Sequence, residues 1–376
     1  MPLEITGGVD THLDVHVAAA LGPTGALLGV ESFDTTLAGY VELYDWLCSF
    51  GEVVKVGVEG TGSYGAGLTR HLHGQGVSVV EVDRPNRQRR RRRGKSDPQD
   101  AIAAARAAQS GDACGEAKTR DGNVESMRVL RVARSSARKG RTQALNQMRS
   151  IISTAPEPIR AELRHLNVYR LIERAGSYRP GQRRDVASLT KLTLRMLARR
   201  AAALEAEVAE IDAILEPLVD ETAPELIARP GIGVDTASTL LVAAGDNPER
   251  LRNEATFAHL CGVAPIDASS GKHEHHRLNR GGDRQANSAL WHIVITRMVY
   301  DPRTRDYIER RTKEGLTKKE AFRCLKRYIA REVFNALLPR PEPALDGPLG
   351  ASLCRAGGSC QDLGRGRCQQ PPKASP

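Results

Sequence analysis

The sequence predicts an N-terminal α/β sheet domain followed by a largely helical remainder. Three apolar, strand-like segments stand in a row at the start of the chain, and helix-like and strand-like segments then alternate up to about residue 109. Consecutive strands usually pair as antiparallel hairpins, whereas strands separated by a helix pair in parallel. We therefore expect a sheet with an antiparallel portion, and a second half of the chain built from helices.

The elements of the α/β domain follow one another along the first 115 residues. We predict strands at 3–9, 13–20 and 25–33, a helix at 36–50, a strand at 53–59, a short helix at 65–76 and a strand at 77–83. Residues 97–109 are predicted to form an alanine-rich helix with acids in its first turn, which the helix dipole favours. We place this domain at 1–115.

Residues 116–220 are predicted to be helical, and their clearest feature is a heptad repeat at 194–218. The apolar residues of the repeat are Leu194, Leu197, Ala201, Leu204, Val208, Ile211, Leu215 and Leu218. A repeat of this length, with charged residues between the apolar ones, indicates a coiled coil. Its partner is either another helix of the same chain or a second subunit, and we favour pairing between subunits.

The segment 221–340 is predicted to be mostly α-helical, with a helix-hairpin-helix turn at PGIG, 230–233. Gly231 and Gly233 would let the backbone approach a phosphate, and the second helix would offer its N-terminal amides. Such a turn binds DNA without reading its sequence, and a plain helical hairpin is the alternative. The tail at 341–376 is rich in Pro, Gly, Ser and Arg and is expected to be disordered.

Composition points to a polyanionic partner. The 376 residues carry a formal net charge of +10 with a pI of about 9.4, which favours nucleic acid, while 4% aromatic residues argue against base stacking as the main binding mode. We expect no transmembrane helix and no signal peptide. Seven dispersed cysteines without a CxxC pair fit reduced thiols in a cytoplasmic protein.

Four carboxylates are expected to meet at one edge of the sheet. Asp10 and Glu59 each end an apolar strand, and Asp97 and Asp100 open a helix. Such a cluster repels itself unless cations neutralise it, and hard divalent cations such as Mg²⁺ prefer oxygen ligands. Two such ions about 4 Å apart can clamp the attacking and leaving oxygens of a phosphodiester.

A dense basic run directly precedes the two acids of the helix start. Its cationic side chains are Arg89, Arg90, Arg91, Arg92, Arg93 and Lys95. A basic run alone is typical of a solvated segment or of a nucleic-acid contact. Beside a metal-binding group of acids, we expect it to hold the nucleic-acid backbone while the metal acts on the phosphate.

A second candidate site is the loop SSGKHEHH at 269–276, which offers two hydroxyls, Ser269 and Ser270, with Lys272 at its rim. A serine-rich loop is more often only a loop, so these residues alone favour the structural interpretation. Downstream, three arginines around a Gly-Gly pair fit a phosphate-binding turn, namely Arg277, Arg280 and Arg284.

The motifs together resemble a known family. GVDTH, VEGTGSYG, KSDPQDA, RPGIG, FAHLCGVAP, and SSGK followed by RLNRGGDRQANSAL occur in this order over roughly residues 5–300. This is similar to the DEDD transposases of bacterial insertion sequences, which are related to Piv-type DNA invertases. The chain differs from the pattern after Gly271, in its dense basic run, and in its tail, but not at the four acids.

The resemblance implies an RNase-H-like (RuvC-like) fold for 1–115, with Asp10, Glu59, Asp97 and Asp100 binding Mg²⁺, and two ions are expected. It also implies a C-terminal transposase domain at 221–340 with a serine nucleophile, Ser270 or, as second choice, Ser269. The implied partners are DNA, a guide (bridge) RNA and further subunits, as a dimer or tetramer, in the nucleoid of a bacterial cytoplasm. Two alternatives stay open: a RuvC-like nuclease or Holliday-junction resolvase that uses metal-bound water, and a non-catalytic nucleic-acid-binding scaffold.

Overall fold

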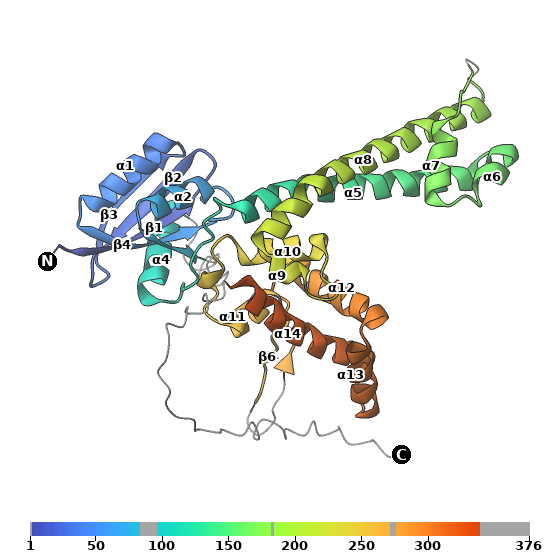
Figure 1. Ribbon diagram of the computed structural model, residues 1–376. Coiled ribbons are helices and arrows are strands. Elements are labelled where there is room, and N and C mark those ends of the chain that lie inside the picture. Colours follow the sequence, from blue (N-terminus) through green and yellow to red (C-terminus); the bar gives the residue numbers. More distant parts are fainter. Residues whose placement is uncertain (1, 83–95, 182–183, 271–275, 339–376) are drawn as a thin grey trace, which may run out of the picture. The chain divides into compact units, whose positions relative to one another are not determined.

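The computed structural model describes residues 2–82, 96–181, 184–270 and 276–338 (Figure 1). The loop residue Lys272 and the tail at 341–376 lie outside these described residues. The whole predicted basic run also lies outside them, namely Arg89, Arg90, Arg91, Arg92, Arg93 and Lys95. No helix in the described ranges combines the length and the apolar composition that crossing a membrane requires.

The N-terminal part of the chain contains a five-stranded mixed sheet, in agreement with the predicted α/β class. In the order β3-β2-β1-β4-β5, its strands are Leu27–Asp34, Val15–Leu21, Glu4–Thr11, Glu52–Glu59 and Ser78–Val82. The first three strands in the sequence pair antiparallel, β4 pairs with β1 in parallel, and β5 pairs with β4 in parallel. The predicted antiparallel portion is therefore confirmed, since consecutive strands form hairpins and helix-separated strands run in parallel.

Helices lie on both faces of this sheet. On one face, α1 (Leu37–Cys48) and α2 (Ala66–Gly74) bury their leucines against the strands. Thr36 begins α1 as its N-cap, because its hydroxyl accepts the backbone N–H of Gly39 at 3.1 Å. On the other face lies α4 (Asp97–Ser110), which contacts β1, β2 and β4.

Two glycines let α4 approach the sheet closely. A Cβ at Gly8 of β1 would lie 2.1 Å from the backbone nitrogen of Ala105, and one at Gly57 of β4 would lie 2.6 Å from the carbonyl oxygen of Ala104. No real side chain fits at such distances, because the neighbouring atoms are helix backbone. The helix is therefore held directly on the two central strands, and its first turn is fixed near their carboxyl ends.

The middle of the chain is a long helical hairpin, with α5 (Asn123–Thr154) and α8 (Val186–Thr222) side by side (Figure 1). The chain between them forms α6 (Glu157–Leu163) and α7 (Val168–Gly176). Ion pairs set the antiparallel register of the long helices, since Arg134 pairs with Asp212 and Arg141 with Glu205.

The heptad at 194–218 packs within this hairpin. Leu194 and Ala201 are fully buried in a cluster with residues of α5, α6 and α7, and Leu215 is fully buried in the core of the C-terminal helices. Leu204 lies over Gly140 of α5, where an added Cβ would be 3.1 Å from its Cδ1. The favoured prediction of a seam between subunits is thus wrong for these buried positions. Heptad periodicity specifies an apolar stripe but not the helix that covers it.

The C-terminal part is mostly α-helical, as predicted. Its helices are α9 (Pro224–Ile227), α10 (Val234–Ala244), α11 (Glu254–Leu260), α12 (Arg284–Tyr300), α13 (Pro302–Lys313) and α14 (Lys318–Leu337), with a 3₁₀ turn at Pro248–Arg250. Phe257, Leu290 and Val333 belong to the core that these helices share. A two-stranded ribbon, β6 (Ile266–Asp267) and β7 (His276–Arg277), brackets the serine loop.

Candidate metal centre

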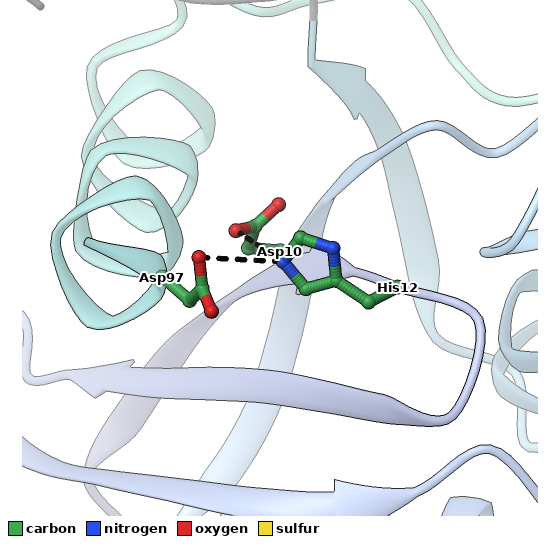
Figure 2. A group of neighbouring side chains, drawn as sticks. All are labelled: Asp10, His12 and Asp97. Atoms are coloured by element: carbon green, nitrogen blue, oxygen red, sulfur yellow. Dashed lines mark hydrogen bonds and ion pairs between the residues drawn. The ribbon is translucent and has the colours of Figure 1, made fainter. Parts of the chain in front are cut away.

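The acids at the end of β1 and at the start of α4 meet in space. Asp10 is the next-to-last residue of β1, and Asp97 is the first residue of α4. Ser96 precedes the helix in an extended conformation, and proline at the helix start has no backbone N–H to lose there. Figure 2 shows Asp97 pointing from the first helical turn toward Asp10 and His12.

His12 lies between the two carboxylates. Its Nε2 atom is 3.2 Å from Oδ2 of Asp10 and 3.4 Å from Oδ1 of Asp97. One ligand atom from each of the three residues lies within 4.8 Å of the others, which is a spacing that a single ion could span. Residues far apart in the sequence thus form one compact group of oxygen and nitrogen donors.

The electrostatics of Asp10 favour a bound cation. Its side chain is only 8% exposed, and burial raises the pKa of its carboxyl above the ordinary value. His12 lowers that pKa, and the negative charges of Asp100 and Asp97 raise it further. The charged form of Asp10 is therefore disfavoured in the protein alone, and a divalent cation would relieve both the desolvation and the repulsion.

Glu59 and Asp100 lie in positions consistent with the same group. Val9 of β1 pairs with Val58 of β4, so Asp10 and Glu59 are the next residues of adjacent parallel strands. Because Gly8 and Gly57 face α4 and side chains alternate along a strand, Asp10 and Glu59 face α4 as well.

Asp100 is one helical turn beyond Asp97, is buried, and acts electrostatically on Asp10. The hydroxyl of Thr11 also donates to the carbonyl oxygen of Glu59 at 2.7 Å, which joins the ends of β1 and β4.

His12 was not among the predicted site residues. The signal was present in the sequence, because residues two apart in a strand share a face and Asp10 was already a candidate. A histidine directly after a strand is also a common turn residue, so its spacing alone did not identify it as a neighbour of Asp97.

The basic run that was predicted to bind phosphate beside the metal centre lies outside the described residues. Its arginines, Arg89, Arg90, Arg91, Arg92 and Arg93, precede the described start of α4, as does Lys95. Their contact with a nucleic-acid backbone therefore stays a prediction from the sequence.

The predicted serine loop is exposed in the structure. Ser269 and Ser270 lie between β6 and β7, and the backbone N–H of Ser269 donates to Oδ1 of Asp267 at 2.8 Å. Hydrogen bonding by Ser269, chiefly through its side chain, lowers the pKa of Asp267. Asp267 thus holds the start of the loop in a turn, and Ser270 follows directly.

The two hairpin glycines at 230–233 have different surroundings. Gly231 has φ +76°, and an added Cβ would meet Cγ of Arg297 at 3.0 Å, so this glycine faces α12. Its Cβ direction is thus occupied by α12, while Gly231 also lines a pocket with Arg229 and Arg303, so its contact with a phosphate stays a prediction. At Gly233, which caps α10, a Cβ would meet no heavy atom within 4 Å, so the predicted approach fits there.

The three predicted phosphate-binding arginines lie near the ribbon and the start of α12. Arg277 is in β7, Arg280 follows it, and Arg284 is the first residue of α12; all three are exposed. Of the Gly-Gly pair between them, Gly282 has a packing role, since a Cβ there would lie 2.3 Å from the backbone nitrogen of Gly262. The sequence did not indicate this contact.

Two family models match separate parts of the chain. Residues 7–155 match the IS110-type DEDD family described as "Transposase", and residues 223–309 match the "Transposase IS116/IS110/IS902 family". An insertion element IS110 protein of 43.6 kDa from Streptomyces coelicolor is 35% identical over 130 residues, or 34% of this chain and 31% of that protein.

An insertion element IS900 protein of 42 kDa from Mycobacterium paratuberculosis is 26% identical over 151 residues, or 39% of this chain and 37% of that protein. The chain thus spans about a third of the length of each of these two relatives. The two family matches together cover more than half of the 376 residues and include the acids and the serine loop. The chain therefore belongs to the IS110 family of insertion-sequence transposases.

Proposed function

We propose that this protein cleaves and rejoins DNA strands for an insertion sequence, with divalent metal ions held by Asp10, Glu59, Asp97 and Asp100. The observation that carries the proposal is the convergence of Asp10, His12 and Asp97 from two distant segments. Carboxylates held this close repel one another unless positive charge neutralises them, so their convergence favours a bound cation. Family membership supplies the substrate class, since transposases act on DNA.

The sheet order β3-β2-β1-β4-β5, with an antiparallel β1–β2–β3 part and parallel β4 and β5, supports the RNase-H-like fold that the resemblance implies. In this arrangement the first strand is central and carries the most buried acid, Asp10. Its neighbours β4 and α4 bring Glu59, Asp97 and Asp100 to the same face. This arrangement of β1, β4 and α4 supports a shared metal-binding role for the four acids.

The donor set fits Mg²⁺, with two ions expected. Carboxylate oxygens are its preferred protein ligands, and bound metal would polarise the phosphate and stabilise the leaving oxygen. In this proposal His12 positions the two acids, because its Nε2 is hydrogen-bonded to Asp10 at 3.2 Å and lies at ion-pair distance, 3.4 Å, from Asp97. His12 is a positioning residue because Mg²⁺ favours oxygen over imidazole.

Ser270 is the proposed nucleophile. A serine hydroxyl is weak at neutral pH and needs a base or a metal to activate it. In the first step, the Oγ of Ser270 loses its proton and bonds to phosphorus as the bond to the departing strand oxygen breaks. That oxygen takes up a proton, and a phosphoserine link remains. Ser269 is the second choice. Its backbone N–H and its side chain both hydrogen-bond to Asp267, which gives Ser269 a structural role in the turn.

A labelled-DNA assay on denaturing gels tests the proposal. The wild type with Mg²⁺ should give cleavage and a covalent protein–DNA adduct. Asp10→Asn should abolish both, while the control Asp14→Asn, at an exposed acid outside the group, should retain both. Ser270→Ala should bind DNA but form no adduct.

Other outcomes select the alternatives. Nicking without any adduct in the wild type and in Ser270→Ala would identify a nuclease or resolvase that uses metal-bound water. An adduct that disappears in Ser269→Ala instead would move the role back by one residue. Binding without any cleavage by the wild type would indicate the non-catalytic scaffold.

The proposal includes a guide RNA and assembly into dimers or tetramers, both of which follow from the family resemblance. The net charge of +10 favours polyanionic partners, a class that includes both DNA and RNA. Sequencing of RNA that co-purifies with the full chain tests the first point. A defined RNA that restores cleavage of one DNA sequence is the expected result, and cleavage that is indifferent to RNA would contradict it.

A further inference from the structure

A basic cavity lies where α5 meets the first turn of α10. Its volume is about 400 Å³, and its lining includes Arg131, Arg134, Ser135, Arg138, Lys139 and Asp235. This volume is within the range of sites that bind small ligands or parts of larger ones. None of these residues belongs to the metal centre, to the serine loop or to the basic run of the N-terminal domain.

The floor of the cavity is a fixed arrangement of guanidinium groups. Nη1 of Arg131 and Nη1 of Arg134 both donate to Oδ1 of Asp235, at 3.1 and 2.6 Å. Arg134 also donates to Asp212 of α8 through Nε at 2.5 Å. The two arginine side chains are only 17% and 13% exposed, so they are held in place before any ligand arrives.

The cationic side chains that line the cavity outnumber the carboxylates that pair with them. Arg138 reaches Asp235 only at 3.9 Å and is 58% exposed, and Lys139 beside it is also exposed. With Arg131 and Arg134, four cationic side chains line the cavity, and the two carboxylates that pair with them are Asp212 and Asp235, a balance of +2.

Ion pairing between helices explains only part of this group. Arg134 with Asp212, and Arg141 with Glu205, form successive rungs that join α5 to α8. Arg138 and Lys139 are on the exposed side of the same helix and add little to such pairing. Their position above a buried arginine floor favours a ligand with negative charge.

We propose that this cavity binds consecutive phosphates of a nucleic-acid backbone. The proposal rests on the proposed function, in which nucleic acid is the substrate, and it adds a binding site that shares no residue with the proposed catalytic groups. Guanidinium groups match phosphate oxygens in pairs, and the N-terminal end of α10 adds a favourable dipole. Arginine, lysine and the hydroxyl of Ser135 contact phosphates without reading bases, so the site binds sequences alike.

Binding titrations of the full chain in EDTA test the site without any cleavage. The variant is Arg138→Gln with Lys139→Gln, which leaves the buried arginine pairs intact. Its matched control is Lys318→Gln with Lys319→Gln, which removes the same charge from exposed positions at the start of α14. The probes are a labelled DNA duplex and a labelled structured RNA, each titrated over a range of salt.

The α5 variant should bind more weakly and show a smaller salt dependence. Two lost contacts to duplex DNA lower the log–log salt slope by about 1.8, so over a fourfold rise in salt the wild type should lose about tenfold more affinity than the variant. A change confined to DNA or to RNA identifies which backbone occupies the cavity, and either result supports the proposal. Equal effects of the α5 variant and its control, or no effect on either probe, would overturn it.

The charge-reversed variant Arg138→Glu with Lys139→Glu provides a second test and should lose further affinity. Circular dichroism melts confirm that each variant remains folded. Because binding is measured without metal, a negative result for the cavity would leave the proposed metal-dependent cleavage untouched. A negative result in the cleavage assay would likewise leave the phosphate site untouched.

Discussion

Gly8→Ala should disturb the metal centre by displacing α4 one to two turns beyond Asp97. The added methyl group would lie 2.1 Å from the backbone nitrogen of Ala105 and 2.4 Å from the carbonyl oxygen of Ala101. Neither atom can rotate away, so the helix itself must move off β1. Overpacking of this kind costs about 1–3 kcal/mol, and a backbone obstacle puts Gly8→Ala at the upper end, about 3 kcal/mol.

Thermal unfolding measures this loss. For an α/β domain of the size predicted here, residues 1–115, a loss of about 3 kcal/mol lowers the Tm by roughly 10–20 °C. Asp97 and Asp100 move with α4, so divalent cations should also bind more weakly to Gly8→Ala. The control Gly74→Ala, at the end of α2, has no heavy atom within 4 Å of its new Cβ and should lower neither the Tm nor the metal affinity. A variant at Gly8 with wild-type Tm and metal affinity would refute the close packing of α4 on β1.

Two further predictions concern stability. Burial lowers the pKa of His16 to about 4, whereas the unfolded chain takes up its proton near 6.5; stability is therefore complete above pH 6.5 and should fall by up to about 3 kcal/mol as the pH drops toward 4. His16→Gln should lose less stability over this range in urea titrations, and an identical pH dependence in both proteins would contradict the assignment. Leu194→Ala should cost about 2–5 kcal/mol because the residue is fully buried in the helical hairpin, whereas Leu189→Ala, at a position 46% exposed, should cost little. If light scattering showed a lower mass for Leu194→Ala than for the wild type, without a loss of stability, the heptad would instead pair subunits.

The sequence was sufficient to predict the α/β sheet and the positions of its acids. Apolar strands ending in Asp10 and Glu59, and a helix beginning at Asp97, are local patterns, and the carboxyl ends of parallel strands share one edge of a sheet. The antiparallel part followed from three strands without an intervening helix. These features depend on neighbours in the sequence or on general rules of sheet topology.

Contacts between distant backbones could not be predicted in the same way. The roles of Gly8 and Gly57 depend on how closely α4 packs, and a glycine in a strand has several possible reasons. The partner of the heptad was also hidden, because arginines that pair with α8, Arg134 and Arg141, interrupt the buried apolar residues of α5. His12 was predictable only in part. Its spacing of two residues from Asp10 could be read from the sequence, but its contact with Asp97 in space could not.

Manganese binding to the full chain tests the central claim most directly. Mn²⁺ accepts the same oxygen ligands as Mg²⁺ and can be counted by the loss of the free-ion signal in electron paramagnetic resonance. The wild type and Asp14→Asn should bind Mn²⁺ equally, while Asp10→Asn should lose that binding, because it removes the most buried carboxylate of the group. Equal Mn²⁺ binding by the wild type and Asp10→Asn would contradict a metal centre at Asp10, Glu59, Asp97 and Asp100.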